Sequence, residues 1–133
     1  MKGFSREVSV LFPCSVEKVW YTVTDLSSTD WRSDLKRVEV LDEIHFVEHT
    51  KSGYATNFTV IVCDPHRYWA FTMENGNMSG SWEGHFEEAS GGSRLVCIET
   101  VNAKHWWMRP FVSGYLKRQQ KLYLEDLRRE LQM

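Results

Sequence analysis

The stretch PFVSGYLKRQQKLYLEDLRREL, residues 110–131, decides the fold that we predict for this chain. Pro110 suits the first turn of a helix, where its missing N–H has no intrahelical partner, and no further Pro follows it. The side chains predicted on one face of this helix are Val112, Leu116, Gln119, Gln120, Tyr123, Leu127 and Leu131. The pattern predicts a helix of about 20 residues, or about 30 Å, long enough to cover a whole sheet.

The preceding residues 37–103 have the character of strands and are divided by five groups of turn-forming residues. These groups lie at 42–43, 51–53, 64–66, 75–77 and 90–92. Six consecutive strands with such short connections form an antiparallel meander. Asn75–Gly76 predicts the tightest hairpin, because a primed turn needs positive φ at both central residues.

The N-terminal part supplies one more strand and two short helices. Residues 4–12 alternate with a period of two and predict a strand that ends at Pro13. Ser15 is a suitable N-cap for a helix that reaches about Asp25, and residues 31–35 are expected to form a second short helix.

This order of elements predicts one α+β domain over residues 1–133. A seven-stranded antiparallel sheet of this size curves, and its concave face must be covered. Only the C-terminal helix is long and apolar enough to do so. We therefore expect the sheet to wrap around that helix, with a cavity between them.

Composition excludes several classes of function. With 42% hydrophobic and 26% charged residues and a net charge of -2, the chain resembles an ordinary globular protein and not a nucleic-acid-binding one. The charged N-terminus and the lack of long apolar runs indicate a cytoplasmic protein without stable membrane insertion. Cys14, Cys63 and Cys97 form no paired motif, so we interpret them as reduced core thiols.

Aromatic residues make up 14% of the chain, and strand alternation predicts where they point. Trp69, Phe71 and Met73 share one face of their strand. On the neighbouring strand Trp82 and Phe86 share a face with Gly84 between them, which is expected to leave room beside the rings. These side chains are predicted to line the cavity.

Several motifs follow one another in an order that resembles the START-like (SRPBCC) superfamily. They lie at the opening strand before Pro13 and at 15–20, 31, 64–68, 91–95 and 124–127. The polyketide cyclase/dehydrase-like branch is the most similar. The resemblance implies a helix-grip fold with an internal apolar pocket, in proteins that bind lipids, polyketides, steroids, hormones or quinones, a few of which catalyse cyclisation or dehydration. No catalytic pattern of the family can be placed on this sequence.

Glu99 is the candidate for acid–base chemistry, and its orientation stays open. If Leu95 and Cys97 face inward, Glu99 does too, and burial would raise its pKa. If Val96 and Ile98 face inward, Glu99 lies in solvent. We favour the solvent-facing orientation, because carboxylates are seldom buried without a partner.

Other polar or aromatic cavity candidates are less specific. Gln119 and Gln120 interrupt the apolar helix face. One interpretation is that a Gln side-chain amide points into the cavity and orients a ligand, and the other is that one Gln reaches the helix edge. Further cavity candidates are Trp31, Tyr54, Asn57, Trp107 and Tyr115. The pair Trp106–Trp107 could close the cavity mouth, form a homodimer contact, or simply pack against the helix start.

Metal and cofactor sites are not predicted. His45 and His49 lie four apart on a strand, roughly 13 Å from each other, too far to share one ion. We expect no cofactor, and solvent-facing histidines.

The predicted function is binding of a small hydrophobic molecule between sheet and helix, with planar ligands favoured by the rings. One alternative is a cyclase or dehydratase, which needs a polar group deep inside. Another is a co-chaperone-like protein-interaction module, which predicts a filled core.

Overall fold

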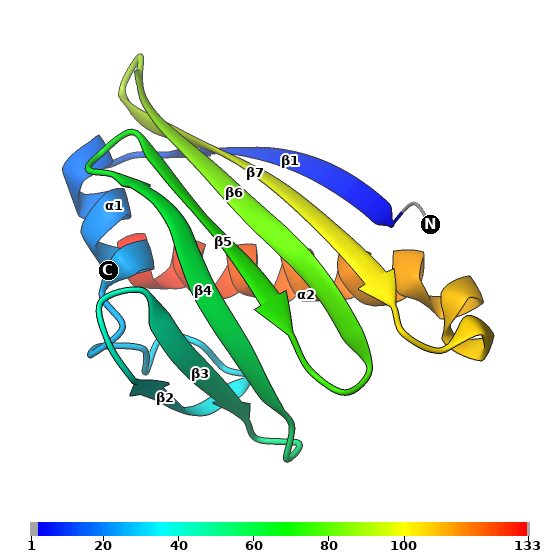
Figure 1. Ribbon diagram of the computed structural model, residues 1–133. Coiled ribbons are helices and arrows are strands. Elements are labelled where there is room, and N and C mark those ends of the chain that lie inside the picture. The colour runs from blue at the N-terminus through cyan, green and yellow to red at the C-terminus, as the bar shows by residue number, and fades with distance from the viewer. Residues whose placement is uncertain (1–2, 133) are drawn as a thin grey trace.

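The computed structural model describes residues 3–132 and contains a seven-stranded antiparallel sheet that curves around a long helix (Figure 1). The strands lie in the order β1-β7-β6-β5-β4-β3-β2. Their bounds are Phe4–Phe12 for β1, Leu35–Val40 for β2, His45–Thr50 for β3, Ala55–Asp64 for β4, Tyr68–Glu74 for β5, Met78–Ala89 for β6 and Gly92–Ala103 for β7. The helix is α2, Arg109–Leu131, preceded by a 3-10 turn η1 at Trp106–Met108.

The predicted sheet is confirmed, including the six-strand meander and the pairing of β1 with β7 at one end of it. All five predicted turns join consecutive strands. The prediction of a primed turn at Asn75–Gly76 is wrong, because positive φ occurs instead at Gly53, His66 and Gly91. The Asn75 side chain accepts the backbone N–H groups of residues 77 and 78 and so forms the turn itself.

Helix α1, Val16–Thr24, is confirmed, and its N-cap Ser15 accepts the Lys18 N–H at 3.2 Å. The second short helix is wrong, because residues 25–34 form irregular turns. The Ser33 N–H is taken by a side chain of α2, Asp126 Oδ2, at 2.8 Å. That amide group is therefore not available for a helical hydrogen bond.

Helix α2 is held on the concave side of the sheet by its buried residues Leu116, Gln120, Leu127 and Leu131. Asp126 is buried as well, although the apolar pattern of the helix did not predict it. Its carboxylate accepts both the N–H and the Oγ–H of Ser33 at 2.8 Å each. These bonds tie the irregular segment to the helix.

We expect Asp126→Ala to lower the free energy of unfolding by about 2 kcal/mol, because a buried charge-assisted hydrogen-bond pair is lost. Urea denaturation followed by circular dichroism measures the change. The control is Glu125→Ala, which removes an exposed carboxylate from the same helix turn and should change stability by less than about 0.5 kcal/mol. Equal effects of the two variants would contradict the anchoring role of Asp126.

Two expectations about the core need correction. Gly84 does not leave free space, because the Trp82 indole lies over it and a Cβ there would collide with that ring. Cys63 is exposed and not a core thiol, whereas Cys97 is buried and Cys14 half-buried. Burial raises the pKa of the Cys97 thiol to about 12, so that group is an unreactive thiol at neutral pH.

Candidate functional site

A cavity of about 140 Å³, the inner chamber, lies between the concave face of the sheet and α2. Its apolar wall is built from alternate residues of neighbouring strands. Phe71 of β5 faces Trp82 of β6 in the register, and the two rings stack with centroids 5.2 Å apart and planes at 9°. Trp69 meets Phe71 edge to face at 5.1 Å. The wall is therefore a surface of aromatic rings packed against one another.

Beside this wall the chamber carries a polar cluster of Arg32, Asp34, Glu48 and Glu99, and Glu99 of β7 is the cross-strand neighbour of Trp82. Arg32 donates two hydrogen bonds of 3.1 Å to the Asp34 carboxylate and one of 3.4 Å to Glu48. Its guanidinium also lies 5.0 Å from the centroid of the Tyr123 ring. Irregular residues 31–34, β3 and β7 each contribute to this cluster, so three distant parts of the chain form it.

The cluster holds three carboxyl groups and one guanidinium, and the pKa values of Glu48 and Glu99 reflect the imbalance. Burial raises the pKa of Glu99 to about 7, with Arg32 opposing the shift and Glu48 adding to it. Burial also raises the pKa of Glu48, against the pull of Arg32. Burial disfavours the charged guanidinium, but Glu48 and Asp34 outweigh it and raise the pKa of Arg32. Part of the Glu99 population therefore carries a proton near neutral pH.

Two buried polar atoms of chamber-lining residues have no hydrogen-bond partner within residues 3–132: Trp31 Nε1 and Gln120 Oε1. The Gln120 amide is oriented by its other end, because Nε2 donates to the Arg6 carbonyl at 3.1 Å. One donor and one acceptor thus remain unpaired. Leaving such a group unpaired costs about 1–3 kcal/mol, which a ligand with matching groups would recover.

A second, wider cavity of about 410 Å³, the vestibule, adjoins the chamber near the N-terminal end of α2. The two cavities share five lining residues, Thr50, Thr56, Met78, Tyr115 and Gln119. Trp107 and Phe111 line the vestibule only. The shared residues mark the passage from the vestibule to the chamber.

Most of the sequence-predicted site residues lie around these two cavities. The inner chamber is lined by Trp31, Trp69, Phe71, Met73, Trp82, Glu99, Tyr115 and Gln119. Tyr54 and Trp107 line the vestibule.

Two predicted cavity residues lie elsewhere. Asn57 is exposed on the outer face of the sheet, because its neighbours Thr56 and Phe58 in β4 take the inward positions. Phe86 is buried but packs on Trp20 of α1, with ring centroids 5.0 Å apart, and does not line the chamber.

The favoured solvent-facing orientation of Glu99 is wrong. Leu95, Cys97 and Val101 of β7 are buried, and Glu99 falls on the same face by alternation. Arg32 and partial protonation offset the cost of placing this carboxyl inside. Arg32 lies in a distant segment of the sequence, so the alternation pattern of β7 gives no sign of it.

Sequence reasoning missed Arg32, Asp34, Glu48 and Tyr123. Two of them had a readable signal. Tyr123 lies on the predicted apolar face of the C-terminal helix, and Glu48 alternates with Phe46 and Thr50 along β3, all of which line the chamber. The other side of the cluster had none, since Arg32 and Asp34 lie in irregular turns without a period.

The histidines considered for a metal have carboxylate partners on the surface. His45 Nδ1 lies 2.9 Å from Asp42 Oδ1, and His49 Nε2 lies 3.2 Å from Glu39 Oε1. Within residues 3–132 no group of three His, Cys, Asp or Glu side chains is arranged to hold a metal ion. Across the same residues, no helix is long and apolar enough to cross a membrane.

Comparison with solved structures defines the class of fold. A START superfamily protein from Mycobacterium smegmatis matches with a TM-score of 0.85 at 12% identity, over 98% of each chain. A conserved protein from Geobacillus kaustophilus matches with a TM-score of 0.83 at 14% identity, over 96% of this chain and 95% of that one. The fold is the START-like helix-grip fold, as the sequence motifs predicted.

The family model "Polyketide cyclase / dehydrase and lipid transport" matches residues 4–132, and the chain belongs to that family. The di-domain ARO/CYC protein BexL, from the BE-7585A biosynthetic pathway, matches with a TM-score of 0.80 at 16% identity. The match covers 98% of this chain and 50% of BexL. A comparison with curated proteins finds no match.

Proposed function

We propose that this protein binds a small, uncharged, largely apolar molecule with a planar part in the inner chamber. The observation that carries the proposal is the pair of stacked rings, Phe71 and Trp82, in one chamber with the polar cluster, whose Glu99 is the cross-strand neighbour of Trp82. Such a cavity, apolar with a few convergent polar groups, is the usual form of a small-molecule site. The family's description, which names polyketide chemistry and lipid transport, supports the same class of ligand.

The size of the cavities limits what the ligand can be. A closed apolar space of about 150 Å³ accommodates one benzene-sized ring. The inner chamber, at about 140 Å³, matches that size, so a larger ligand extends past Tyr115 and Gln119 into the vestibule. The ligand is therefore expected to be elongated, with one ring held deep inside.

The charge of the cluster excludes one group of hydrophobic ligands. Asp34, Glu48 and Glu99 together exceed the single positive charge of Arg32, which Asp34 and Glu48 already pair. A ligand carboxylate would meet net negative charge in a poorly solvated place, which is unfavourable. Fatty acids and other organic anions should thus be bound weakly.

We expect 2-naphthol to bind and its anionic analogue 2-naphthoate to bind at least tenfold more weakly at neutral pH, because the cluster repels the carboxylate. Quenching of tryptophan fluorescence and isothermal titration calorimetry measure both affinities. Native mass spectrometry of freshly purified protein tests directly for a retained small molecule. Absence of binding by both compounds, or equal affinity for them, would count against the proposed site.

The Trp31→Phe variant tests the unpaired indole donor. It keeps an aromatic ring but removes Nε1–H, and the affinity for 2-naphthol should fall about fivefold to tenfold. The stability of the unliganded protein should change little, because the Nε1–H group that is removed makes no hydrogen bond within the described part of the chain. Trp106→Phe, at an exposed position, is the control and should leave the affinity unchanged. Equal affinities for Trp31→Phe and the native chain would remove Trp31 from the ligand site.

A second function, acid–base catalysis on the bound molecule, is favoured by one observation. Glu99 lies in the chamber with a pKa raised to about 7, close to the value of an efficient general acid or base. In such a reaction the protonated carboxyl would donate its proton to a ligand oxygen, and the carboxylate would take one back. Glu99→Gln should then abolish turnover of a trial polyketide substrate while 2-naphthol still binds. Unchanged turnover in this variant would exclude the role.

The protein-interaction alternative predicted a filled core. The inner chamber and the vestibule occupy that place, so this alternative has no support from the packing.

A further inference from the structure

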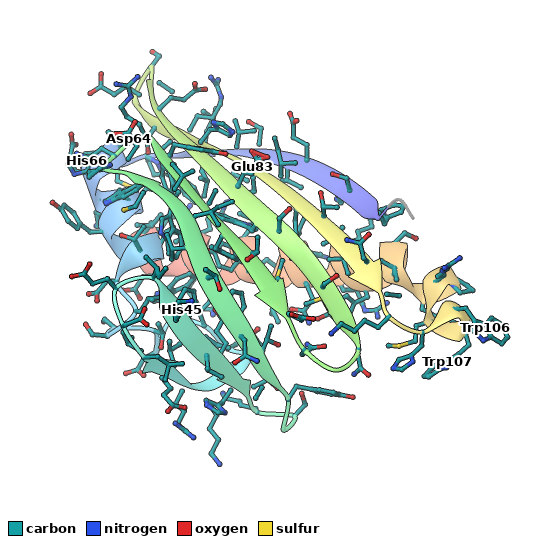
Figure 2. The ribbon with its side chains drawn as sticks, viewed as in Figure 1. His45, Asp64, His66, Glu83, Trp106 and Trp107 are labelled. Atoms are coloured by element: carbon teal, nitrogen blue, oxygen red, sulfur yellow. The ribbon has the colours of Figure 1, made fainter. Side chains whose placement is uncertain are left out.

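Three large apolar side chains project into solvent where the chain turns from β7 into α2. Trp106, Trp107 and Phe111 have exposed fractions of 77%, 57% and 70%, and we call them the aromatic tip. Figure 2 shows Trp106 and Trp107 extending from the end of the molecule remote from α1. Simple packing against the helix start does not account for them, because none is buried.

Positive charge predominates around the aromatic tip. Residues 101–124 contain five Lys and Arg and no Asp or Glu, in a chain whose net charge is -2. We call Lys104, Arg109 and Arg118 the cationic rim. Lys104 precedes the tip in sequence, Arg109 lies between Trp107 and Phe111, and Arg118 lines the vestibule with Trp107. Glu74 of β5 bonds Lys104 at 2.7 Å and neutralises part of this charge. Arg109 and Arg118 make no ion pair within residues 3–132.

We propose that the aromatic tip and the cationic rim dock this protein on the surface of an anionic lipid bilayer. Trp favours the boundary between lipid headgroups and acyl chains, and Lys and Arg beside it attract anionic headgroups. A symmetric dimer through the same surface is disfavoured, because a two-fold axis would place the cationic rims of two copies against each other. The docked orientation turns the vestibule towards the bilayer, since Trp107 and Phe111 line its wall.

Cosedimentation with phosphatidylcholine vesicles, with and without phosphatidylserine, tests the proposal on the full chain. The native protein should bind the phosphatidylserine vesicles and be released by high salt, because the attraction is screened. Loss of both indoles in Trp106→Ala/Trp107→Ala should weaken binding more than tenfold, since each contributes buried apolar area. Arg109→Glu should weaken it by more than about fivefold, because loss of one cation near an anionic surface already has that effect and the new carboxylate adds repulsion.

Matched controls come from the rest of the surface. Ile61→Ala removes an equally exposed apolar side chain from β4, and Arg67→Glu reverses a charge in the β4–β5 turn. Both controls should bind vesicles as the native chain does. All variants should keep the native melting temperature within a few degrees, because every substituted side chain is exposed.

Three results would overturn the docking proposal. They are no binding of the native chain to phosphatidylserine vesicles, equal loss of binding in the control variants, or a concentration-dependent dimer that Trp106→Ala/Trp107→Ala converts to monomer. The docking surface is independent of the ligand proposal, because vesicle binding can be measured without a ligand in the chamber.

Discussion

Replacing Arg32 by Gln is expected to lower the free energy of unfolding by about 3–5 kcal/mol near pH 8, the usual cost of breaking a buried ion pair. The Arg32 side chain is only 14% exposed and carries the positive charge that Asp34 and Glu48 pair with. Without it, three carboxyl groups remain together in a poorly solvated place. Chemical denaturation followed by circular dichroism measures the loss.

The loss of stability in Arg32→Gln should become smaller as the pH falls. Removing Arg32 raises the pKa values of Glu48 and Glu99 further, so the folded variant binds more protons than the unfolded chain. Its stability therefore recovers as the pH falls from about 7 towards 4.5, the raised and the ordinary pKa of Glu99, because the carboxyls that lost Arg32 bind protons. A loss independent of pH would show that Arg32 contributes by packing alone.

The matched control is Arg94→Gln, which breaks an exposed pair with Glu87 at an N–O distance of 3.1 Å. Exposed ion pairs contribute at most about 1 kcal/mol, so this variant should stay near native stability. The contrast between the two arginines isolates the effect of burial.

Glu99→Gln is expected to stabilise the protein by up to about 3 kcal/mol near pH 8. This energy corresponds to the rise of the Glu99 pKa to about 7. The ordinary pKa of this carboxyl is 4.5, so between these values the folded state holds a proton that the unfolded state has released. The favourable contribution is fully present below about pH 4.5 and is lost as the pH rises through about 7. The amide mimics the protonated form at every pH and abolishes this dependence.

Free energies of unfolding measured from about pH 4 to about pH 9 test this prediction. The native chain and Glu99→Gln should agree at the acid end and separate steadily as the pH rises. Glu87→Gln, at an exposed position, is the control and should follow the native curve. Parallel curves for the native chain and Glu99→Gln would mean that Glu99 keeps its ordinary pKa and has no special role in the chamber.

Local patterns determined the frame of this protein. Alternation along β5 placed Trp69, Phe71 and Met73 on one face, and turn-forming residues marked all five hairpins. The long helix followed from its apolar face and the lack of later Pro. These features depend on residues near one another in the sequence, so the sequence alone was sufficient to predict them.

The tertiary structure decided the chemistry of the chamber. Arg32 meets Glu48 sixteen residues away, and Ser33 meets Asp126 ninety-three residues away, so neither contact has a local signal. The Ser33–Asp126 bond explains why residues 31–35 form no helix, and the positive charge of Arg32, which opposes the burial cost of the Glu99 carboxylate, explains why Glu99 can face inward. The physical reason is that burial of a charge depends on its partner, and folding alone brings the partners together.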